Sequence, residues 1–304
     1  MLKLKVPATS ANLGPGFDTL GLAMKVYNTF FFSEIDRGID LIIRDKSTGK
    51  IFEIPQEDNL LYQAMKFLFN KRGKEFTGLK IIEEINIPFA RGMGSSATAV
   101  TAGLVAANIL MDKPYTEQEI IDFSVEIEGH PDNVLPALKG GFVINVMGDN
   151  GLVYKKMTVS NNLKIVMIIP DFQLKTEDLR SVLPDKIQYR DAIFNQSRTA
   201  LLTACFYDND WSKLRSAMED RLHQDYRADL IPGFHKLLEI AYQSGALGVA
   251  LSGAGPSLLA FCKQDEELIG QNMAAEFAEF KINSTYMITE VDNKGIQVEK
   301  TGVR

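Results

Sequence analysis

The chain has 304 residues, a formal net charge of −6 at pH 7, 45% hydrophobic residues and 24% charged residues. This composition is typical of a soluble globular protein long enough for two domains. Because Lys and Arg are scattered along the chain, we expect no nucleic-acid partner. Two cysteines are too few for a disulfide framework and the N-terminus lacks a long apolar run, so we expect a cytoplasmic protein.

In the first half of the chain, apolar spacing predicts strands and helices in turn. The helix expected at 59–71 has Asp58 or Asn59 as a possible N-cap, and Thr116 and Glu119 have the spacing of a capping box. The most apolar stretch, 97–111, is short for a membrane span, so we expect a buried helix there and no membrane partner. In chain order, the expected elements are strands at 2–6, 26–32 and 39–44, a helix at 59–71, a strand at 79–87, helices at 97–111 and 120–128, and a strand at 140–147.

The second half is expected to begin at a polar, turn-forming stretch at 148–151, which predicts domains at 1–150 and 151–304. The element order beyond it is close to a split βαβ pattern, so the expected fold class is α+β in two domains. The expected elements are a strand at 164–169, helices near 176–183, 191–207, 211–223 and 233–244, strands at 247–251 and 257–262, a helix at 266–280, and a strand at 285–291.

A glycine loop lies between the strand at 79–87 and the helix at 97–111, and it contains Gly92, Gly94 and Ser95. Glycines let the backbone approach a ligand, and the first turn of a helix presents unpaired N–H groups, so we expect a phosphate group there. The lysine-bearing P-loop pattern and the protein-kinase triplets are absent from the sequence. The spacing Gly92-x-Gly94-x-x-Ala97 fits a loose dinucleotide fingerprint, and a tight turn without a ligand stays an alternative.

Two further segments rich in glycine and serine are attached to strands. One is 6–21, after the first strand, and the other is 251–257, between two apolar strands. Either segment alone is compatible with an ordinary turn. Together with the loop at 88–98, they predict three turns that converge on one anionic ligand.

The amino-acid sequences of three segments resemble those of a known family. They read Pro-Ala-Thr-Ser-Ala-Asn-Leu-Gly-Pro-Gly-Phe-Asp at 7–18, Glu-Gly-His-Pro-Asp-Asn-Val at 128–134, and Tyr-Arg-Ala-Asp-Leu-Ile-Pro at 226–232. With the loops at 88–98 and 251–257, nearly the whole chain resembles the GHMP kinase superfamily, and most of all the branch that phosphorylates L-homoserine. The resemblance implies a first domain like ribosomal protein S5 domain 2 and a ferredoxin-like second domain. It also implies ATP and Mg²⁺ as cofactors, L-homoserine as substrate, and a homodimer.

The histidines and cysteines show no metal-ligand spacing, so any metal would be a hard cation held by oxygen atoms. By the resemblance, Ser96 and Glu128 hold Mg²⁺, while Ser95 either caps the helix or binds the metal. Glu126 lies two residues from Glu128 and so on another helix face, which makes it the poorer candidate.

The resemblance also assigns the nucleotide site. Asn59 is expected near the adenine and Thr176 near the γ-phosphate, with helix capping as an alternative for each. The nucleotide-binding residues that the resemblance implies are Pro88, Phe89, Ala90, Arg91, Gly92, Met93, Gly94, Ser95, Ser96, Ala97, Thr98, Asn59 and Thr176.

L-Homoserine, the implied acceptor, carries an ammonium group, a carboxylate and a terminal hydroxyl. An acid suits the ammonium, and a planar guanidinium suits the carboxylate better than a lysine does. The resemblance assigns Asp18 to the ammonium and Arg180 and Arg227 to the carboxylate. The other substrate-binding residues that it implies are Asn12, beside Asp18, and His130 and Asn133, at the hydroxyl end.

The catalytic residues implied are Asn133, Glu128, Ser96 and Arg227. Several members of the superfamily have Asp where this chain has Asn133, and an amide takes up no proton, so catalysis by positioning and electrostatics is expected. Asp132 is an alternative base, although consecutive residues generally point apart. We therefore expect Asp132→Asn to keep most activity and Asn133→Ala to lose much of it.

Three other functions stay open on sequence alone. One is a GHMP kinase for another small alcohol, such as mevalonate or a sugar. A second is a non-catalytic protein that senses ATP and a metabolite, which would not need Ser96 and Glu128. The third is a dinucleotide-dependent oxidoreductase, although its glycine motif normally opens a domain.

Overall fold

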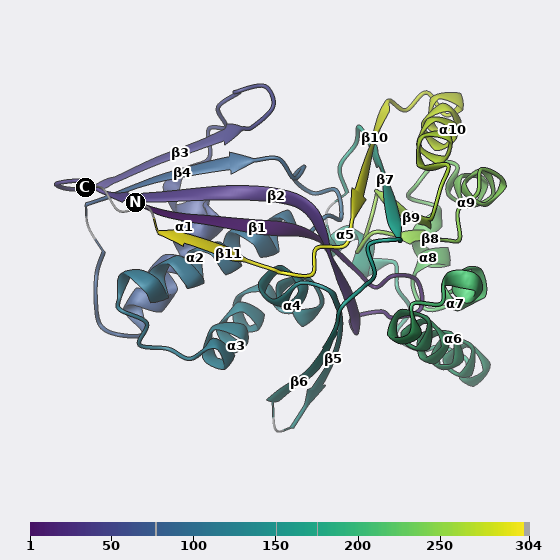
Figure 1. Cartoon of the computed structure of the whole chain (residues 1–304), viewed down its shortest axis with the longest axis horizontal. Coiled ribbons are helices and arrows are strands. Elements are labelled where there is room, and N and C mark those ends of the chain that lie inside the picture. Colours follow the sequence, from purple (N-terminus) through teal and green to yellow (C-terminus); the bar gives the residue numbers. More distant parts are fainter. Residues whose placement is uncertain (77, 150, 175, 301–304) are drawn as a thin grey trace.

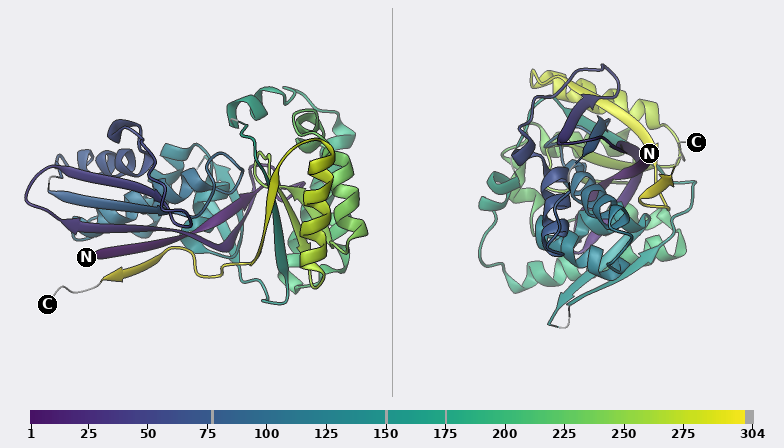
Figure 2. Two further views of the ribbon diagram at one scale, coloured as in Figure 1. Left: turned by 90° about the horizontal axis from the view of Figure 1, so that it is seen from above. Right: turned by 90° about the vertical axis from the view of Figure 1, so that its left-hand side faces the viewer.

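The computed structural model describes residues 1–76, 78–149, 151–174 and 176–300. Within these residues, two units lie side by side along the long axis of the molecule (Figure 1). One unit holds a seven-stranded sheet and helices α1 to α4, and the other holds a four-stranded sheet and most of the remaining helices. Figure 2 shows the N-terminus at the far end of the larger unit, away from the smaller one.

The larger sheet has the order β11-β1-β2-β4-β3 along its main path. All neighbours are antiparallel except β3 and β4, which are parallel. β5 pairs with the first residues of β2 and with β6, which forms the hairpin that projects below the sheet in Figure 1. These strands are β1 (Leu2–Ala11), β2 (Leu20–Glu34), β3 (Ile39–Asp45), β4 (Leu79–Ile85), β5 (Phe142–Gly148), β6 (Gly151–Met157) and β11 (Gln297–Lys300).

Helices α1 (Leu60–Asn70), α2 (Ser95–Leu110), α3 (Glu117–Glu128) and α4 (Pro131–Lys139) pack against the larger sheet. Asn59 caps α1, because its Oδ1 accepts the N–H of Tyr62, and the predicted capping box of Thr116 and Glu119 is confirmed at α3. α2 is buried on almost every side, as its uninterrupted run of small and apolar residues predicts. The start of α2 is therefore fixed in space by the core beneath it.

The smaller sheet has the order β10-β7-β9-β8, with all neighbours antiparallel. Alternation along β7 separates its two faces: Val166 and Ile168 pack under α9 and α10, and Met167 faces α6. The face toward α6 also joins a core that includes residues of β2 and β5, so one hydrophobic cluster connects the two units. The elements are β7 (Lys164–Pro170), α5 (Thr176–Ser181), α6 (Tyr189–Asp208), α7 (Leu214–Ala217), α8 (Gln224–Ala228), α9 (Phe234–Gln243), β8 (Gly248–Leu251), β9 (Leu258–Cys262), α10 (Glu266–Glu279) and β10 (Ser284–Glu290).

Several predicted elements differ from the observed ones. The first strand continues to Ala11, past an irregularity between Pro7 and Ala8, so the first part of the segment at 6–21 is a buried strand and not a turn. The helix expected at 211–223 is only a 3₁₀ turn at Trp211–Lys213 followed by α7, and the next helix, α8, begins beyond that range at Gln224. The break occurs because the Asp220 carboxylate accepts backbone N–H groups that a continuous helix would bond internally. Helix α4 and strands β6 and β11 were not among the expected elements.

Strand pairing bears on where the two units divide. β6 pairs with β5, and β11 pairs with β1, so both strands belong to the larger sheet. The chain passes from one sheet to the other between Met157 and Lys164, and it returns at its C-terminal end. The division at residue 150 therefore stays a proposal about domains rather than a boundary between sheets. Across the described part of the chain, we find no helix with the length and apolar character needed to span a bilayer.

Candidate active site

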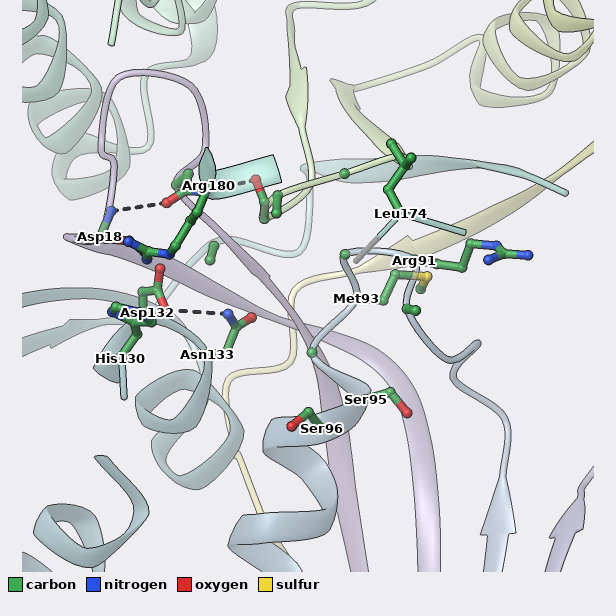
Figure 3. Close-up of a pocket in the computed structure, with 18 of the residues that line it drawn as sticks. Asp18, Arg91, Met93, Ser95, Ser96, His130, Asp132, Asn133, Leu174 and Arg180 are labelled. Carbon is green, nitrogen blue, oxygen red and sulfur yellow. Dashed lines mark hydrogen bonds and ion pairs between the residues drawn. The ribbon is translucent and has the colours of Figure 1, made fainter. Parts of the chain in front are cut away.

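A cavity of about 290 Å³ lies where the two units meet. All three predicted loops line it, which confirms that they converge, and the segment 128–134 together with α5 and α8 completes the wall. Charged and polar side chains gather here from elements far apart in the sequence, as Figure 3 shows. The lining residues are Ala11, Asn12, Phe17, Asp18, Ala90, Arg91, Gly92, Met93, Gly94, Ser95, Ser96, Glu128, His130, Asp132, Asn133, Leu174, Arg180, Arg227, Gly253, Ala254 and Gly255.

The glycine loop ends directly at the first turn of α2. Gly92 and Gly94 have φ values of +72° and +67°, in the left-handed region. A Cβ atom on Gly92 would lie 2.1 Å from the carbonyl oxygen of Ser252, and one on Gly94 would lie 1.9 Å from Oγ1 of Thr9. Glycine is therefore required at both positions, since the loop packs directly against the other two predicted loops.

Hydrogen bonds join the three loops to one another. The Thr9 N–H donates to the Met93 carbonyl over 3.1 Å, and the Ser252 hydroxyl donates to the Gly92 carbonyl over 2.6 Å. These bonds use carbonyl groups of the loop, and the N–H groups of the first turn of α2 have no partner within the helix. The loop therefore presents donors and a helix dipole to an anion in the cavity.

Ser96 and Glu128 meet at the side of the cavity next to α2. The Ser96 hydroxyl donates to Oε2 of Glu128 over 2.9 Å. Burial raises the pKa of the Glu128 carboxyl, and the bond from Ser96 offsets only part of that rise. Gly94, not Ser95, is the N-cap of α2, and the Ser95 hydroxyl is directed back toward the Ile87 carbonyl at 3.4 Å. Glu126 lies outside the cavity, where it pairs with Lys71.

Asp18 and Arg180 form an ion pair at the opposite end of the cavity. Nη2 of Arg180 lies 2.8 Å from Oδ1 of Asp18. Asn12 fixes the loop that carries Asp18, because its Oδ1 accepts the Asp18 N–H and its Nδ2 donates to the Gly253 carbonyl. Figure 3 shows His130 and Asp132 beside this pair and apart from Ser95 and Ser96.

Arg227 supplies a second guanidinium group to the same end. Its side chain is almost completely buried, and burial together with the nearby Arg180 lowers its pKa to about 10. Nε donates to the Leu179 carbonyl over 3.0 Å, and Nη1 lies 3.0 Å from Nδ1 of His223. Both guanidinium groups lie over the ring of Phe17. Two cations that converge on one cavity favour an anionic group in the ligand.

Asp132 and Asn133 both line the cavity, although adjacent residues were expected to point apart. They belong to the first turn of α4, which begins at Pro131. Burial raises the pKa of Asp132 to about 7, and the negative charge of Asp18 adds to the rise. The amide of Asn133 is held on both sides: its oxygen accepts the Thr9 hydroxyl at 2.8 Å, and its nitrogen lies 3.3 Å from Oδ1 of Asp132. Burial and Arg180 also lower the pKa of His130.

Some predicted nucleotide residues lie outside the cavity wall. Asn59 donates to Oε1 of Glu83 over 2.7 Å in addition to capping α1. The Thr98 hydroxyl is engaged with the Ser95 carbonyl, and Phe89 packs edge-on against Phe52. The side chain of Thr176 lies outside the described residues. The predicted residues that do not line the cavity are Asn59, Pro88, Phe89, Ala97 and Thr98.

The cavity also contains residues that sequence reasoning did not single out. Phe17 and Gly253–Gly255 fall inside two of the predicted loops, so their place in those motifs was a usable signal. Leu174 had no such signal. The guanidinium group of Arg91 points away from the Asp18 end and toward Asp171, 3.7 Å from it, so only part of Arg91 faces the cavity (Figure 3).

No group of three or more His, Cys, Asp or Glu side chains is positioned to hold a metal within the described part of the chain. A cation at the α2 end would thus take Ser96 and Glu128 together with oxygen atoms of a ligand, as Mg²⁺ commonly does.

The chain is similar to known proteins along nearly its whole length. Residues 59–141 match the model for the GHMP kinases N terminal domain, and residues 200–279 match the GHMP kinases C terminal model. The chain is 52% identical over 297 residues to a homoserine kinase of Halothermothrix orenii, covering 97% of this chain and 96% of that protein. It is 44% identical to a homoserine kinase of Clostridium beijerinckii, covering 98% of each. A crystal structure of homoserine kinase from Cytophaga hutchinsonii superposes with a TM-score of 0.86 at 30% identity, covering 98% of this chain and 97% of that one.

Proposed function

This chain belongs to the homoserine kinases of the GHMP kinase family, and we propose that the cavity is where it transfers the γ-phosphoryl group of ATP to the hydroxyl oxygen of L-homoserine. The product is O-phospho-L-homoserine, on the route to threonine. The main support for assigning the reaction to this cavity is the charge pattern at one of its ends, where Asp18 lies next to Arg180 and Arg227.

The end of the cavity that Asp18, Arg180 and Arg227 line, called the acceptor end, suits a zwitterion. An ammonium and a carboxylate on one carbon atom need an anion and a planar cation close together. We place the ammonium at Asp18 and the carboxylate at Arg180 and Arg227, with Asn12 holding the Asp18 loop. An acceptor without an ammonium, such as mevalonate, would have no use for Asp18.

The α2 end suits a triphosphate and its metal. The backbone N–H groups of residues 90–96 and the first turn of α2 would hold the phosphate oxygens. Ser96 and Glu128 fit Mg²⁺, because a hydroxyl and a half-buried carboxylate 2.9 Å apart are hard oxygen donors, and the Ser96 hydroxyl is the one described hydrogen-bond partner of that carboxylate. When bound, Mg²⁺ supplies neutralisation of the phosphate charge.

Asn133 lies between the two ends and is proposed to orient the acceptor hydroxyl. Its amide is fixed by Thr9 and Asp132, so its direction is set before an acceptor binds. An amide takes up no proton, and a loose phosphoryl-transfer transition state needs little help from a base. His130 would contact the same end of the acceptor.

ADP release measured with Mg²⁺ and ATP against several alcohols tests this function. The panel is L-homoserine, L-serine, D-homoserine, mevalonate and galactose. We expect turnover selective for L-homoserine, with Arg227→Lys raising its KM because lysine lacks the planar fork. Selective turnover of another alcohol would contradict the acceptor assignment. Tight ATP binding without ADP release for any acceptor would replace the kinase with a sensor.

Two further expectations remain proposals. The resemblance implies a homodimer, which light scattering on purified protein would test. The cytoplasmic location rests on the two cysteines, which are both buried and unpaired, and localisation of a tagged full-length chain would test it.

A further inference from the structure

Behind the acceptor end, His223 connects two parts of the site that are far apart in the sequence. Its side chain is completely buried and does not line the cavity. Nδ1 lies 3.0 Å from Nη1 of Arg227, and Nε2 lies 2.7 Å from the carbonyl oxygen of Gly14. The ring therefore bridges a proposed carboxylate-binding side chain and the loop that carries Asp18.

The two bonds determine the protonation state of the ring. A guanidinium group has donors and no acceptor, so Nδ1 must offer its lone pair to Arg227. The Gly14 carbonyl only accepts, so Nε2 must carry the proton. His223 is thus neutral and protonated on Nε2, because a second proton would set an N–H group against the guanidinium.

The charged groups around the ring are consistent with a neutral state. Burial is the main cause that lowers the pKa of His223, and Arg227 acts in the same direction. Asp220, 3.6 Å from Nε2, and Asp18 act against it. Asp220 is already engaged, since it accepts the backbone N–H groups of Leu222, His223 and Gln224.

The smaller unit also holds the Asp18 loop at other points. Nδ2 of Asn195 and the hydroxyl of Thr199, both on α6, donate to the Pro15 carbonyl over 3.2 and 2.9 Å. Phe17 stacks on the ring of His223 with their centroids 5.2 Å apart. Among the residues described, Phe17 and His223 both contact Arg227 from this network, and His223 is the one that hydrogen-bonds to its guanidinium.

We propose that His223 is a positioning residue that fixes the distance between the Arg227 guanidinium and the Asp18 loop, and so the fit of the acceptor's carboxylate and ammonium. This inference rests on the proposed function for the roles of Arg227 and Asp18. Two of the five N–H groups of Arg227 are held by Leu179 and His223, which leaves the others for the acceptor.

Steady-state kinetics of three variants test the proposal. His223→Leu removes both bonds, whereas His223→Gln keeps an acceptor for Arg227 and a donor for Gly14. His235→Leu, at an exposed position on α9, is the matched control. We expect His223→Leu to raise the KM for L-homoserine about tenfold or more, with His223→Gln within about threefold and the KM for ATP unchanged in all three. The proposal would be overturned if His223→Leu and His223→Gln raised the KM for L-homoserine equally, or if the KM for ATP changed in parallel with it.

A measurement on the unaltered protein does not depend on how the variants fold. The chain has three histidines, so ¹⁵N-histidine labelling resolves each ring. We expect His223 to be neutral and protonated on Nε2 at pH 6, where a free histidine with a pKa of about 6.5 is mostly charged. A charged ring, or protonation on Nδ1, would overturn the proposed geometry. If the unaltered protein phosphorylates no acceptor, the proposed function fails while this spectrum still decides the state of His223.

Discussion

The two ends of the cavity are built in different ways. The phosphate end, next to α2, comes mainly from one short stretch, residues 90–96, with Glu128 of α3 as its carboxylate, and it acts mostly through backbone N–H groups, two glycines and the start of α2. The acceptor end comes from four separate elements, and acts through long charged side chains such as Asp18, Arg180 and Arg227. The phosphate end is therefore mostly a local structure, whereas the acceptor end exists only when the two units are packed together.

This difference has an electrostatic consequence. At the acceptor end Asp18 and Arg180 already form an ion pair, whereas the Arg227 guanidinium is held by two uncharged partners, the Leu179 carbonyl and the neutral His223 ring. A bound zwitterion would replace the Asp18–Arg180 ion pair with its own pairs, and its carboxylate would also give Arg227 a counter-ion. At the phosphate end the half-buried Glu128 has a raised pKa, so a cation there would stabilise its ionised form.

The largest expected effect comes from the one carboxylate at the phosphate end. We expect Glu128→Gln to reduce kcat by about 100- to 1,000-fold, the usual cost of removing one group that stabilises transition-state charge. Folding stability should be unchanged or higher, because a half-buried carboxylate is replaced by a neutral amide. Glu126→Gln, an exposed position on the same helix, is the control and should keep full activity. Equal losses in the two variants, measured as ADP release and thermal unfolding, would show that Glu128 has no special role.

A smaller effect is expected from the backbone of the glycine loop. Gly92→Ala should lower the free energy of unfolding by about 2–4 kcal/mol, because a left-handed φ is combined with an overlap against the Ser252 carbonyl. Gly73→Ala is the control, since Gly73 has φ +60° and no atoms within 4 Å of the position that a Cβ would take, and it should cost about 1–2 kcal/mol. Denaturant unfolding of both variants measures the difference. Equal costs would mean that the loop is not packed as described.

The smallest effect is expected at the acceptor end, in the pH dependence of stability. Asp132 has a pKa of about 7 in the folded chain against a usual 3.8, so the folded state binds more protons between these values. Stability should then fall as the pH rises from about 4 to about 7. Asp132→Asn should remove that decrease and keep most activity, whereas Asn133→Ala should lose much of it. Parallel stability profiles for the Asp132→Asn variant and the unaltered protein would contradict the raised pKa.

The local parts of the structure could be predicted well. The cap at Asn59, the capping box at Thr116 and the helix that follows the glycine loop depend on neighbours within a few residues. The expected helix at 211–223 was wrong, because one residue within it, Asp220, takes the backbone donors that would have continued it. Strands β6 and β11 were missed, since an edge strand at a sheet border has little apolar alternation to reveal it.

The amino-acid order was sufficient to predict the glycine loop and the helix that follows it, because these depend on local backbone conformation. It was also sufficient to identify the resemblance to the GHMP kinases, because that resemblance depends on residue order in three segments. The side-chain contacts between distant elements, by contrast, depend on the tertiary structure and could not be predicted from the sequence. The tertiary structure brought Thr9 to Asn133, paired Asp18 with Arg180, and placed His223 between Gly14 and Arg227. The reason is that these contacts join elements far apart in the chain, where burial and neighbouring charges set each group's protonation and direction.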